Sequence, residues 1–272
     1  MVRPKLVPPR GVLYWKPSLD MPGYARFWPS EDLAPFVEHF WTVEWNEPAP
    51  SVRQVLPHPS VQMVLEAGAS RVAGVHRGRF LTTLEGRGRV LGTKFLPGGF
   101  RPFLGRPVST ITGRSLLLEE VFGSTAENLE SRALALLEPA AAFEVVEEFL
   151  RARNPRPDDA IGRIGRLIER ATTDREITRV EQLVHQSGVG LRALQRLFGD
   201  YVGVSPKWVI QRYRLHEAAE RIAREPGVDG ASLAAELGYA DQAHFIRDFK
   251  RLVGRTPADY ARSFAGPRGG NA

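Results

Sequence analysis

The feature that most constrains the fold is an internal repeat of about 50 residues in the C-terminal part of the chain. Leu183 and Gly188 recur 50 residues later as Leu233 and Gly238. Further positions recur 51 residues later, with glycine and proline among them: Leu194 as Phe245, Arg196 as Arg247, Phe198 as Phe249, Val202 as Val253, Gly203 as Gly254 and Pro206 as Pro257. The chain therefore carries one structural unit twice, with one extra residue in the second turn.

Each copy is predicted to be a short helix, a tight turn and a second helix. In the first copy Val180, Leu183 and Val184 share one helical face, and Gly188 can take the positive φ that ends a helix sharply. The second helix of this copy and both helices of the second copy have apolar faces with the same helical spacing. Their expected buried residues are Leu194, Leu197 and Phe198, then Leu233, Ala234, Leu237, Phe245 and Phe249. This is the helix-turn-helix pattern, whose second helix can enter a DNA major groove.

The solvent-facing stripes of the two second helices favour DNA reading. Arg192, Gln195 and Arg196 lie at i, i+3 and i+4, and arginine can pair with guanine as glutamine can with adenine. In the second copy we expect more phosphate contact, with a thymine-methyl contact from Ala243 or Ile246. That stripe is Gln242, Ala243, Ile246 and Arg247, with Lys250 a turn further on. The alternative is two merely solvated faces, which their recurrence on a duplicated scaffold disfavours.

A continuous helix is predicted between the two copies, from Ser205 to Arg224. Ser205 is the expected N-cap and Pro206 the first helical residue. Twenty helical residues span about 30 Å, close to the pitch of B-DNA at about 34 Å. One chain can thus place both second helices in successive major grooves.

These motifs resemble the DNA-binding domain of the AraC/XylS family of bacterial transcription regulators. The resemblance covers about 105 residues from Asp158 and lies in three runs: 189–198 (VGLRALQRLF), 203–206 (GVSP) and 233–257, which contains LAAELGYADQAHFIRDFKR and GRTP. It implies a seven-helix domain of two helix-turn-helix subdomains that binds specific promoter DNA. It further implies base contacts by Arg192, Gln195, Arg196, Gln242, Ile246 and Arg247.

Three positions in these runs affect the helix starts and the expected DNA contacts. Gly190 and Ala243 stand where the family often has serine, which implies a weaker helix start and one fewer polar contact. His244 is expected to pack or touch the DNA backbone rather than bind a metal.

A composition change at 154–159 (NPRPDD) predicts a domain boundary, with one domain over 1–154 and the DNA-binding domain over 155–272. The first domain is expected to be β-rich to about residue 115, with one early helix from Ser30 to Phe40. Its strands are predicted at 61–66, 71–75, 79–84 and 89–95, and two helices split near Pro139 occupy 116–153. The fold class is therefore α+β: a small β-barrel-like domain with a helical tail, then an all-α domain.

The run 95–103 (FLPGGFRPF) resembles a group of AraC-type regulators with sensor domains, which makes the mouth of the barrel the expected effector pocket. Aromatic residues cluster early in the chain and fit either a pocket lining or a core: Tyr14, Trp15, Tyr24, Phe27, Trp28, Phe36, Phe40, Trp41 and Trp45. The helices after residue 116 can pair two chains or pack on the barrel, through Leu134, Leu137, Phe143, Val146 and Phe149.

Cysteine content, net charge and the absence of known catalytic motifs limit the functions that this chain can have. The chain has no cysteine, and its 37 basic against 31 acidic residues leave a net charge of +6, which suits a polyanion partner. His39, His58 and His76 show no metal-ligand spacing, and neither a catalytic nor a nucleotide-binding motif is present. No signal peptide or membrane span is expected. We therefore expect a cytoplasmic protein that is not an enzyme and needs no metal or cofactor.

The leading hypothesis is a sequence-specific, DNA-binding transcription regulator that responds to a small-molecule effector. The first alternative is an enzyme or repair protein with a DNA-targeting module, which the absence of a cysteine methyl acceptor disfavours. The second is a non-specific architectural DNA binder. Double-stranded promoter DNA is the expected partner; RNA polymerase, an effector and a second copy of the chain are further candidates.

Overall fold

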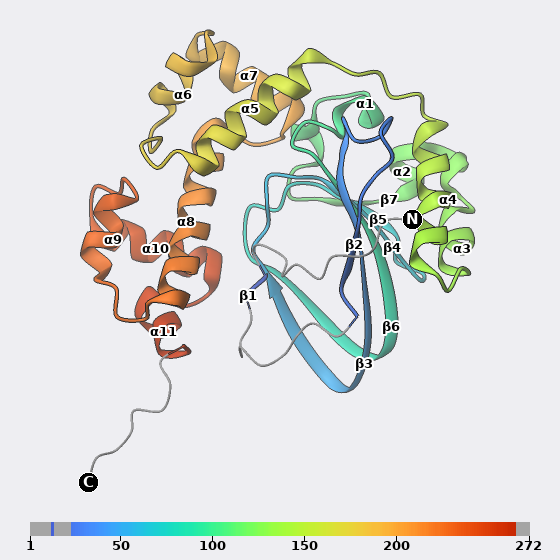
Figure 1. Cartoon of the computed structure of the whole chain (residues 1–272), viewed down its shortest axis with the longest axis horizontal. Coiled ribbons are helices and arrows are strands. Elements are labelled where there is room, and N and C mark those ends of the chain that lie inside the picture. Colours follow the sequence, from blue (N-terminus) through green and yellow to red (C-terminus); the bar gives the residue numbers. More distant parts are fainter. Residues whose placement is uncertain (1–11, 14–22, 265–272) are drawn as a thin grey trace.

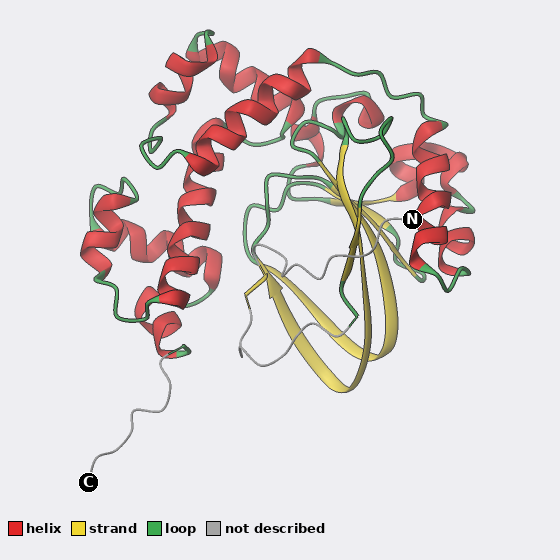
Figure 2. Ribbon diagram, viewed as in Figure 1, coloured by secondary structure: helices red, strands yellow, loops and turns green. Residues whose placement is uncertain are grey.

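The computed structural model describes the backbone of Val12–Leu13 and all of residues 23–264. An antiparallel sheet with its own helices forms the N-terminal part, and a helical domain follows it (Figure 1, Figure 2). The α+β class and the β-then-α order predicted from the sequence are confirmed. Helix α4 ends at Arg151 and helix α5 begins at Asp159, on either side of the predicted boundary.

The sheet has seven described strands that pair only in antiparallel fashion. Their order is β1-β3-β6-β4-β5-β7, with β2 also paired to β3. Among the described strands, no pair joins β7 to β1 or β2, so the sheet they form is open rather than a closed barrel. The strands are β1 Val12–Leu13, β2 Ala25–Phe27, β3 Val37–Val55, β4 Gln62–Glu66, β5 Arg71–Ala73, β6 Phe80–Phe95 and β7 Ser115–Leu117.

The predicted early helix is wrong. Residues 31–36 form turns, closed by bonds such as Ala34 N–H to Ser30 O, and Val37 already begins β3. Leu33, Phe36, Val37 and Phe40 have helical spacing and are all buried, but the first two lie in the turns and the last two in the strand. The strands predicted at 61–66 and 71–75 are confirmed as β4 and β5, and those at 79–84 and 89–95 are one strand, β6.

Helices cover one face of the sheet and build its core. Phe40 of β3 stacks on Phe143 of α4, with ring centroids 5.0 Å apart, and Phe95 of β6 packs against Phe100. Val146 and Phe149 are buried in the same core, whereas Leu137 is 87% exposed. The helices are α1 Arg101–Leu104, α2 Leu118–Phe122, α3 Leu129–Leu134 and α4 Pro139–Arg151, with 3-10 turns η1 Val108–Ile111 and η2 Gly123–Ala126.

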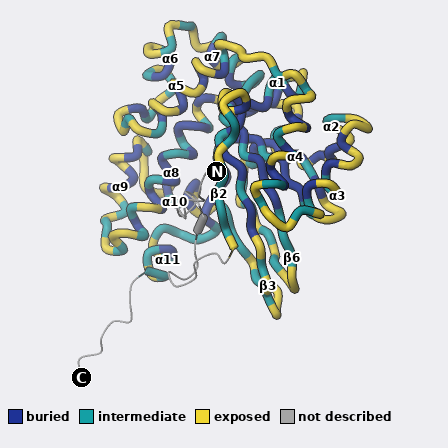
Figure 3. Tube along the Cα trace, turned by 45° about the vertical axis from the view of Figure 1, so that its right-hand side comes forward, coloured by how far each residue is buried: buried dark blue, intermediate teal, exposed yellow. Residues whose placement is uncertain are grey.

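Seven helices fill residues 159–264 and bury two cores (Figure 3). They are α5 Asp159–Thr173, α6 Val180–Ser187, α7 Leu191–Tyr201, α8 Pro206–Arg224, α9 Gly230–Glu236, α10 Gln242–Val253 and α11 Pro257–Arg262. Within the described ranges, no helix combines the length and apolar character needed to cross a membrane.

The two parts of the chain pack against each other. Helices α2 to α4 lie on one side of the sheet and α5 to α11 on the other (Figure 1). Leu56, just after β3, belongs to the core of the second repeat, and Ile161 of α5 belongs to the core of the sheet. The loops of the N-terminal domain thus sit directly on the helical domain.

Candidate nucleic-acid interface

The first repeat folds into two helices joined by a tight turn. Gly188 ends α6 with φ at +68°, in the left-handed region that glycine enters without steric cost. Leu183 on α6 and Leu194 and Phe198 on α7 are completely buried in one core. Gly190 takes the N-cap position of α7, and no side chain caps that helix start.

The second repeat has the same geometry. Gly238 follows α9 with φ at +79°, and Leu233, Phe245 and Phe249 occupy the buried positions equivalent to those of the first repeat. Here the helix start is capped, because the Asp241 carboxylate accepts the N–H of His244 at 2.7 Å. The duplicated sequence therefore folds as a duplicated helix-turn-helix.

The predicted DNA-reading side chains lie on the outer faces of α7 and α10. Arg192, Gln195 and Arg196 are exposed on α7, as are Gln242, Ala243, Arg247 and Lys250 on α10. Ile246 differs, because it is half-buried and packs against the second core. Across residues 23–264, no carboxylate pairs with the cations at 192, 196, 247 or 250, so their charge is available to a polyanion.

His244 packs as predicted. Its ring meets the edge of Tyr239 at 5.3 Å between centroids, and its Nε2 lies 3.3 Å from an oxygen of the buried Asp248. Asp248 also accepts from Arg251 at 2.8 Å. In the described part of the chain, no group of three or more histidine and carboxylate side chains gathers as a metal site would require.

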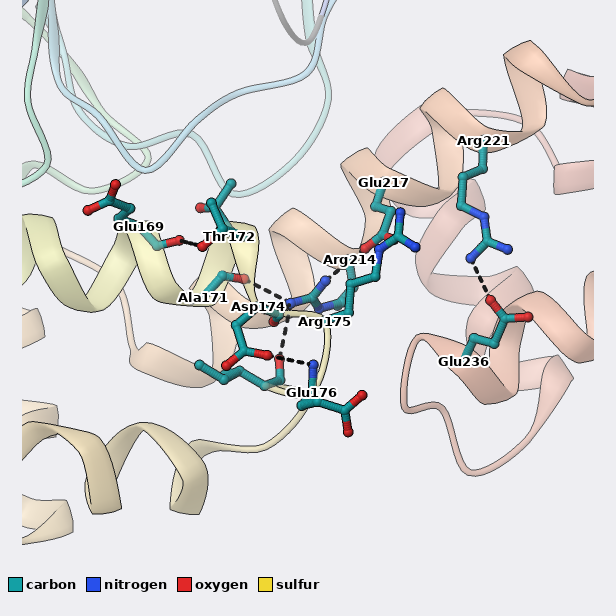
Figure 4. Close-up of polar contacts among 12 residues, drawn as sticks. Glu169, Ala171, Thr172, Asp174, Arg175, Glu176, Arg214, Glu217, Arg221 and Glu236 are labelled. Carbon is teal, nitrogen blue, oxygen red and sulfur yellow. Dashed lines mark hydrogen bonds and ion pairs between the residues drawn. The ribbon is translucent and has the colours of Figure 1, made fainter.

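The linker helix α8 is anchored to the end of α5 by a buried arginine (Figure 4). Arg214 is 2% exposed, and its Nη2 donates to the carbonyls of Ala171 at 3.0 Å and Asp174 at 2.6 Å. These carbonyls end α5 and lack helical partners, so the guanidinium satisfies them. Its Nη1 also pairs with Glu217 at 2.7 Å, and Glu217 pairs with Arg175 at 2.9 Å.

Two further contacts fix the repeats relative to each other. Arg221 of α8 pairs with Glu236 of α9 at 2.6 Å (Figure 4). A Cβ on Gly238 would lie 2.5 Å from the Cβ of Thr178, so the turn of the second repeat touches the segment that leads into α6. The Ser205 cap predicted from the sequence is confirmed, because the Trp208 N–H donates to the Ser205 hydroxyl at 3.2 Å. The role of Arg214 was not predicted, since no local pattern marks an interior arginine.

A cavity of about 220 Å³ lies on the sheet face opposite the helical core. It is lined by alternate residues of the strands, including Trp41, Val43 and Trp45 of β3, and by the loops around His58 and His76. Of the predicted aromatic cluster, Tyr24, Trp41 and Trp45 line this cavity, while Phe27, Phe36 and Phe40 pack into the core. Trp28 is 47% exposed, and Tyr14 and Trp15 lie outside the described residues.

The charged groups beside the cavity are mostly paired. Although burial raises the pKa of Glu38, hydrogen bonds and charge from His39 and Lys94 outweigh it and hold that pKa at about 2. The Lys94 ammonium is 2.9 Å from Glu38, and burial lowers the pKa of His39. Burial likewise raises the pKa of Tyr24. The cavity therefore has an apolar interior with neutralised ion pairs at its margin.

The fold and the interface define a class of protein, the double helix-turn-helix. Residues 183–263 match a family described as a helix-turn-helix domain, and residues 25–116 match one described as a domain of unknown function, DUF6597. The C-terminal part of the chain is a helix-turn-helix domain of the AraC type.

Regulators are among the proteins that this chain resembles. The HTH-type transcriptional regulator Rv1931c of Mycobacterium tuberculosis is 32% identical over 87 residues, which are 32% of this chain and 33% of that protein. The RCS-specific HTH-type transcriptional activator RclR of Escherichia coli is 32% identical over 81 residues, 30% of this chain and 28% of that protein. A crystal structure of ToxT from Vibrio cholerae covers 84% of this chain and 98% of its own, at 14% identity and a TM-score of 0.37. The chain thus resembles these two regulators over about a third of their length.

Proposed function

We propose that this protein is a transcription regulator that binds double-stranded promoter DNA in a sequence-specific way. The observation that carries the proposal is a pair of exposed polar stripes on the equivalent helices α7 and α10, whose cations pair with no carboxylate of residues 23–264. The 19-residue helix α8 separates them, and its length of about 28 Å is close to one turn of B-DNA.

Each side chain has a role that follows from its chemistry. Arg192 and Arg196 suit guanine edges and Gln195 suits adenine, so the first repeat supplies most of the base reading. In the second repeat we assign Gln242 and Arg247 to base edges and Lys250 to phosphate, with methyl contacts from Ala243 and the exposed part of Ile246.

The N-terminal domain is the proposed effector-binding part, with the cavity on the sheet as its site. The protein acts by binding rather than catalysis, in the cytoplasm, without a metal or cofactor. RNA polymerase and a second copy of the chain, which can meet the exposed Leu137, are its further proposed partners.

Replacing Arg196 tests base reading. We expect Arg196→Ala to relax preference at one base position and to cost about 1–3 kcal/mol on the preferred site, because a forked guanine contact is lost. The measurement is selection of bound DNA from random sequence, followed by titration of the preferred and altered sites. Arg87→Ala removes an exposed arginine from the middle of β6, where it pairs with Asn46 of β3, outside both helix-turn-helix repeats, and should change neither quantity. An equal loss on every DNA sequence would favour the architectural binder.

A further inference from the structure

The cavity face of the sheet carries a continuous row of side chains that crosses five strands. Arg26 is the register partner of Trp41, Trp41 of Gly92, Gly92 of Val64, and Val64 of Arg71. Register partners in a sheet project on the same face, so this row lies together under the cavity. Apart from the glycine, every member of the row lines the cavity.

Two indole rings form the floor of this cavity because glycines lie beneath them. A Cβ on Gly92 would come within 1.9 Å of the Trp41 ring, and one on Gly88 within 2.1 Å of the Trp45 ring. Trp45 and Gly88 are also register partners. Each ring therefore lies against the sheet with one face on a glycine, and its other face is turned toward the cavity.

The polar edges of both rings are already satisfied. The Trp41 indole N–H donates to Gln62 Oε1 at 3.1 Å, and that of Trp45 donates to the Glu85 carbonyl at 3.2 Å. These bonds fix the ring planes and leave only apolar faces for a ligand. Val43 and Val90, register partners of each other, line the cavity between the two rings. The floor is apolar over about 13 Å, the length of four strand residues.

One cation stands at the end of this floor without a carboxylate partner. Arg71 pairs with Glu66 at 2.7 Å, Arg53 with Glu47 at 2.8 Å and Lys94 with Glu38 at 2.9 Å. Arg26 instead donates to the phenol oxygen of Tyr24, and no carboxylate in residues 23–264 forms an ion pair with it. Its place beside Trp41 puts a positive charge at the edge of the aromatic floor.

We infer that the cavity binds a planar aromatic carboxylate. The ring system stacks on Trp41 and extends toward Val43 and Val90, and the carboxylate pairs with Arg26 in a forked contact. A saturated acid of the same size lacks the flat face that stacks on the Trp41 ring, and a neutral aromatic lacks the carboxylate that pairs with Arg26. The inference rests on the proposed function only in treating this cavity as the effector site.

Binding of 2-naphthoate to the full-length protein tests it, with calorimetry and quenching of tryptophan fluorescence as readouts. We expect saturable binding, at least tenfold tighter than that of the neutral 2-naphthamide or of the saturated decahydro-2-naphthoate. Arg26→Gln should weaken naphthoate at least tenfold and leave naphthamide unchanged. Trp41→Leu should weaken both, whereas Trp28→Leu and Arg87→Gln, outside the cavity, should change neither.

Three results would overturn the inference. They are no naphthoate binding, equal affinity for the saturated acid, and unchanged naphthoate affinity in Arg26→Gln. The last comparison holds even where Trp41→Leu fails to fold. Each preparation is also titrated with its selected DNA in the absence of any probe. Loss of ligand binding with intact DNA binding contradicts only this inference, whereas absence of DNA binding contradicts the proposed function.

Discussion

At the scale of single residues, Arg214 shows how one buried side chain can hold two helices together. Its guanidinium satisfies carbonyls at the end of α5 and pairs with Glu217, which is itself only 18% exposed. Removing one partner of such a buried network leaves the others desolvated and unpaired, which costs far more than losing a surface ion pair.

We therefore expect Arg214→Met to lower the free energy of unfolding by about 3–5 kcal/mol. Urea denaturation of the full chain measures the change. Arg224→Ala, an exposed arginine at the end of the same helix, is the control and should stay within about 0.5 kcal/mol of the parent protein. A loss below about 1 kcal/mol in Arg214→Met would contradict the anchoring role.

At the scale of elements, α8 acts as the spacer between the two DNA-reading helices. It is continuous from Pro206 to Arg224 and is tied to α5 by Arg214 and to α9 by Arg221. A rigid spacer lets the second repeat bind at high effective concentration once the first has bound.

Breaking this helix should separate the two binding events. Glu220 is exposed, so Glu220→Pro removes a backbone hydrogen bond and kinks α8, whereas Glu220→Ala keeps the helix. We expect the proline variant to bind a two-groove site about 100-fold more weakly than the alanine variant. Both should bind a single half-site equally, as measured by titration of labelled duplexes. Equal affinity of the two variants for the full site would contradict the spacer role.

The helices were predictable from sequence because their signals are local. Ser205 and Pro206 start α8 and Gly188 ends α6, each within one or two turns of the residues that it affects. The sheet was harder to predict from sequence than the helices, because its contacts are not local. Phe36 and Val37 belong to a set of buried residues with helical spacing, although Phe36 lies in a turn and Val37 begins a strand. Trp41 contacts Gly92 and Arg26 only because their strands pair in the folded sheet. No local pattern marks those partners, so the sequence predicts the aromatic cluster but not the cavity floor.

At the scale of the whole molecule, the N-terminal domain holds the equivalent ends of both DNA-reading helices. The Thr112 hydroxyl donates to the Gly203 carbonyl at 2.7 Å, just after α7. The Gln54 amide donates to the Leu252 and Val253 carbonyls, at 3.3 and 3.0 Å, at the end of α10. Between these points, Arg212 of α8 donates to the Arg77 carbonyl at 2.7 Å. The domains thus form one packed unit.

This packing should make stability depend on pH through His216 of α8. Burial, and then the neighbouring His58, Arg212 and Lys94, hold the pKa of His216 well below 6.5, against a hydrogen bond to the Pro57 backbone. The folded state keeps the ring neutral, while the unfolded chain takes up a proton below about pH 6.5. Stability should therefore fall on acidification, by up to about 1.4 kcal/mol per pH unit for this one group.

Urea denaturation at pH 7.5, 6.5 and 5.5 measures this dependence. His216→Asn cannot titrate and should show a shallower fall, with His39, whose pKa is also lowered by burial, supplying part of what remains. The same slope in His216→Asn and in the parent protein would contradict the assignment.

The central claim is that one chain reads two successive major grooves with α7 and α10. Hydroxyl-radical footprinting of the full chain on a selected DNA site tests this claim most directly. We predict two protected segments whose centres lie one helical turn, about 10–10.5 base pairs, apart. Arg196→Ala should weaken protection of one segment and Arg247→Ala that of the other. A single protected segment, or no protection at any sequence, would contradict the account.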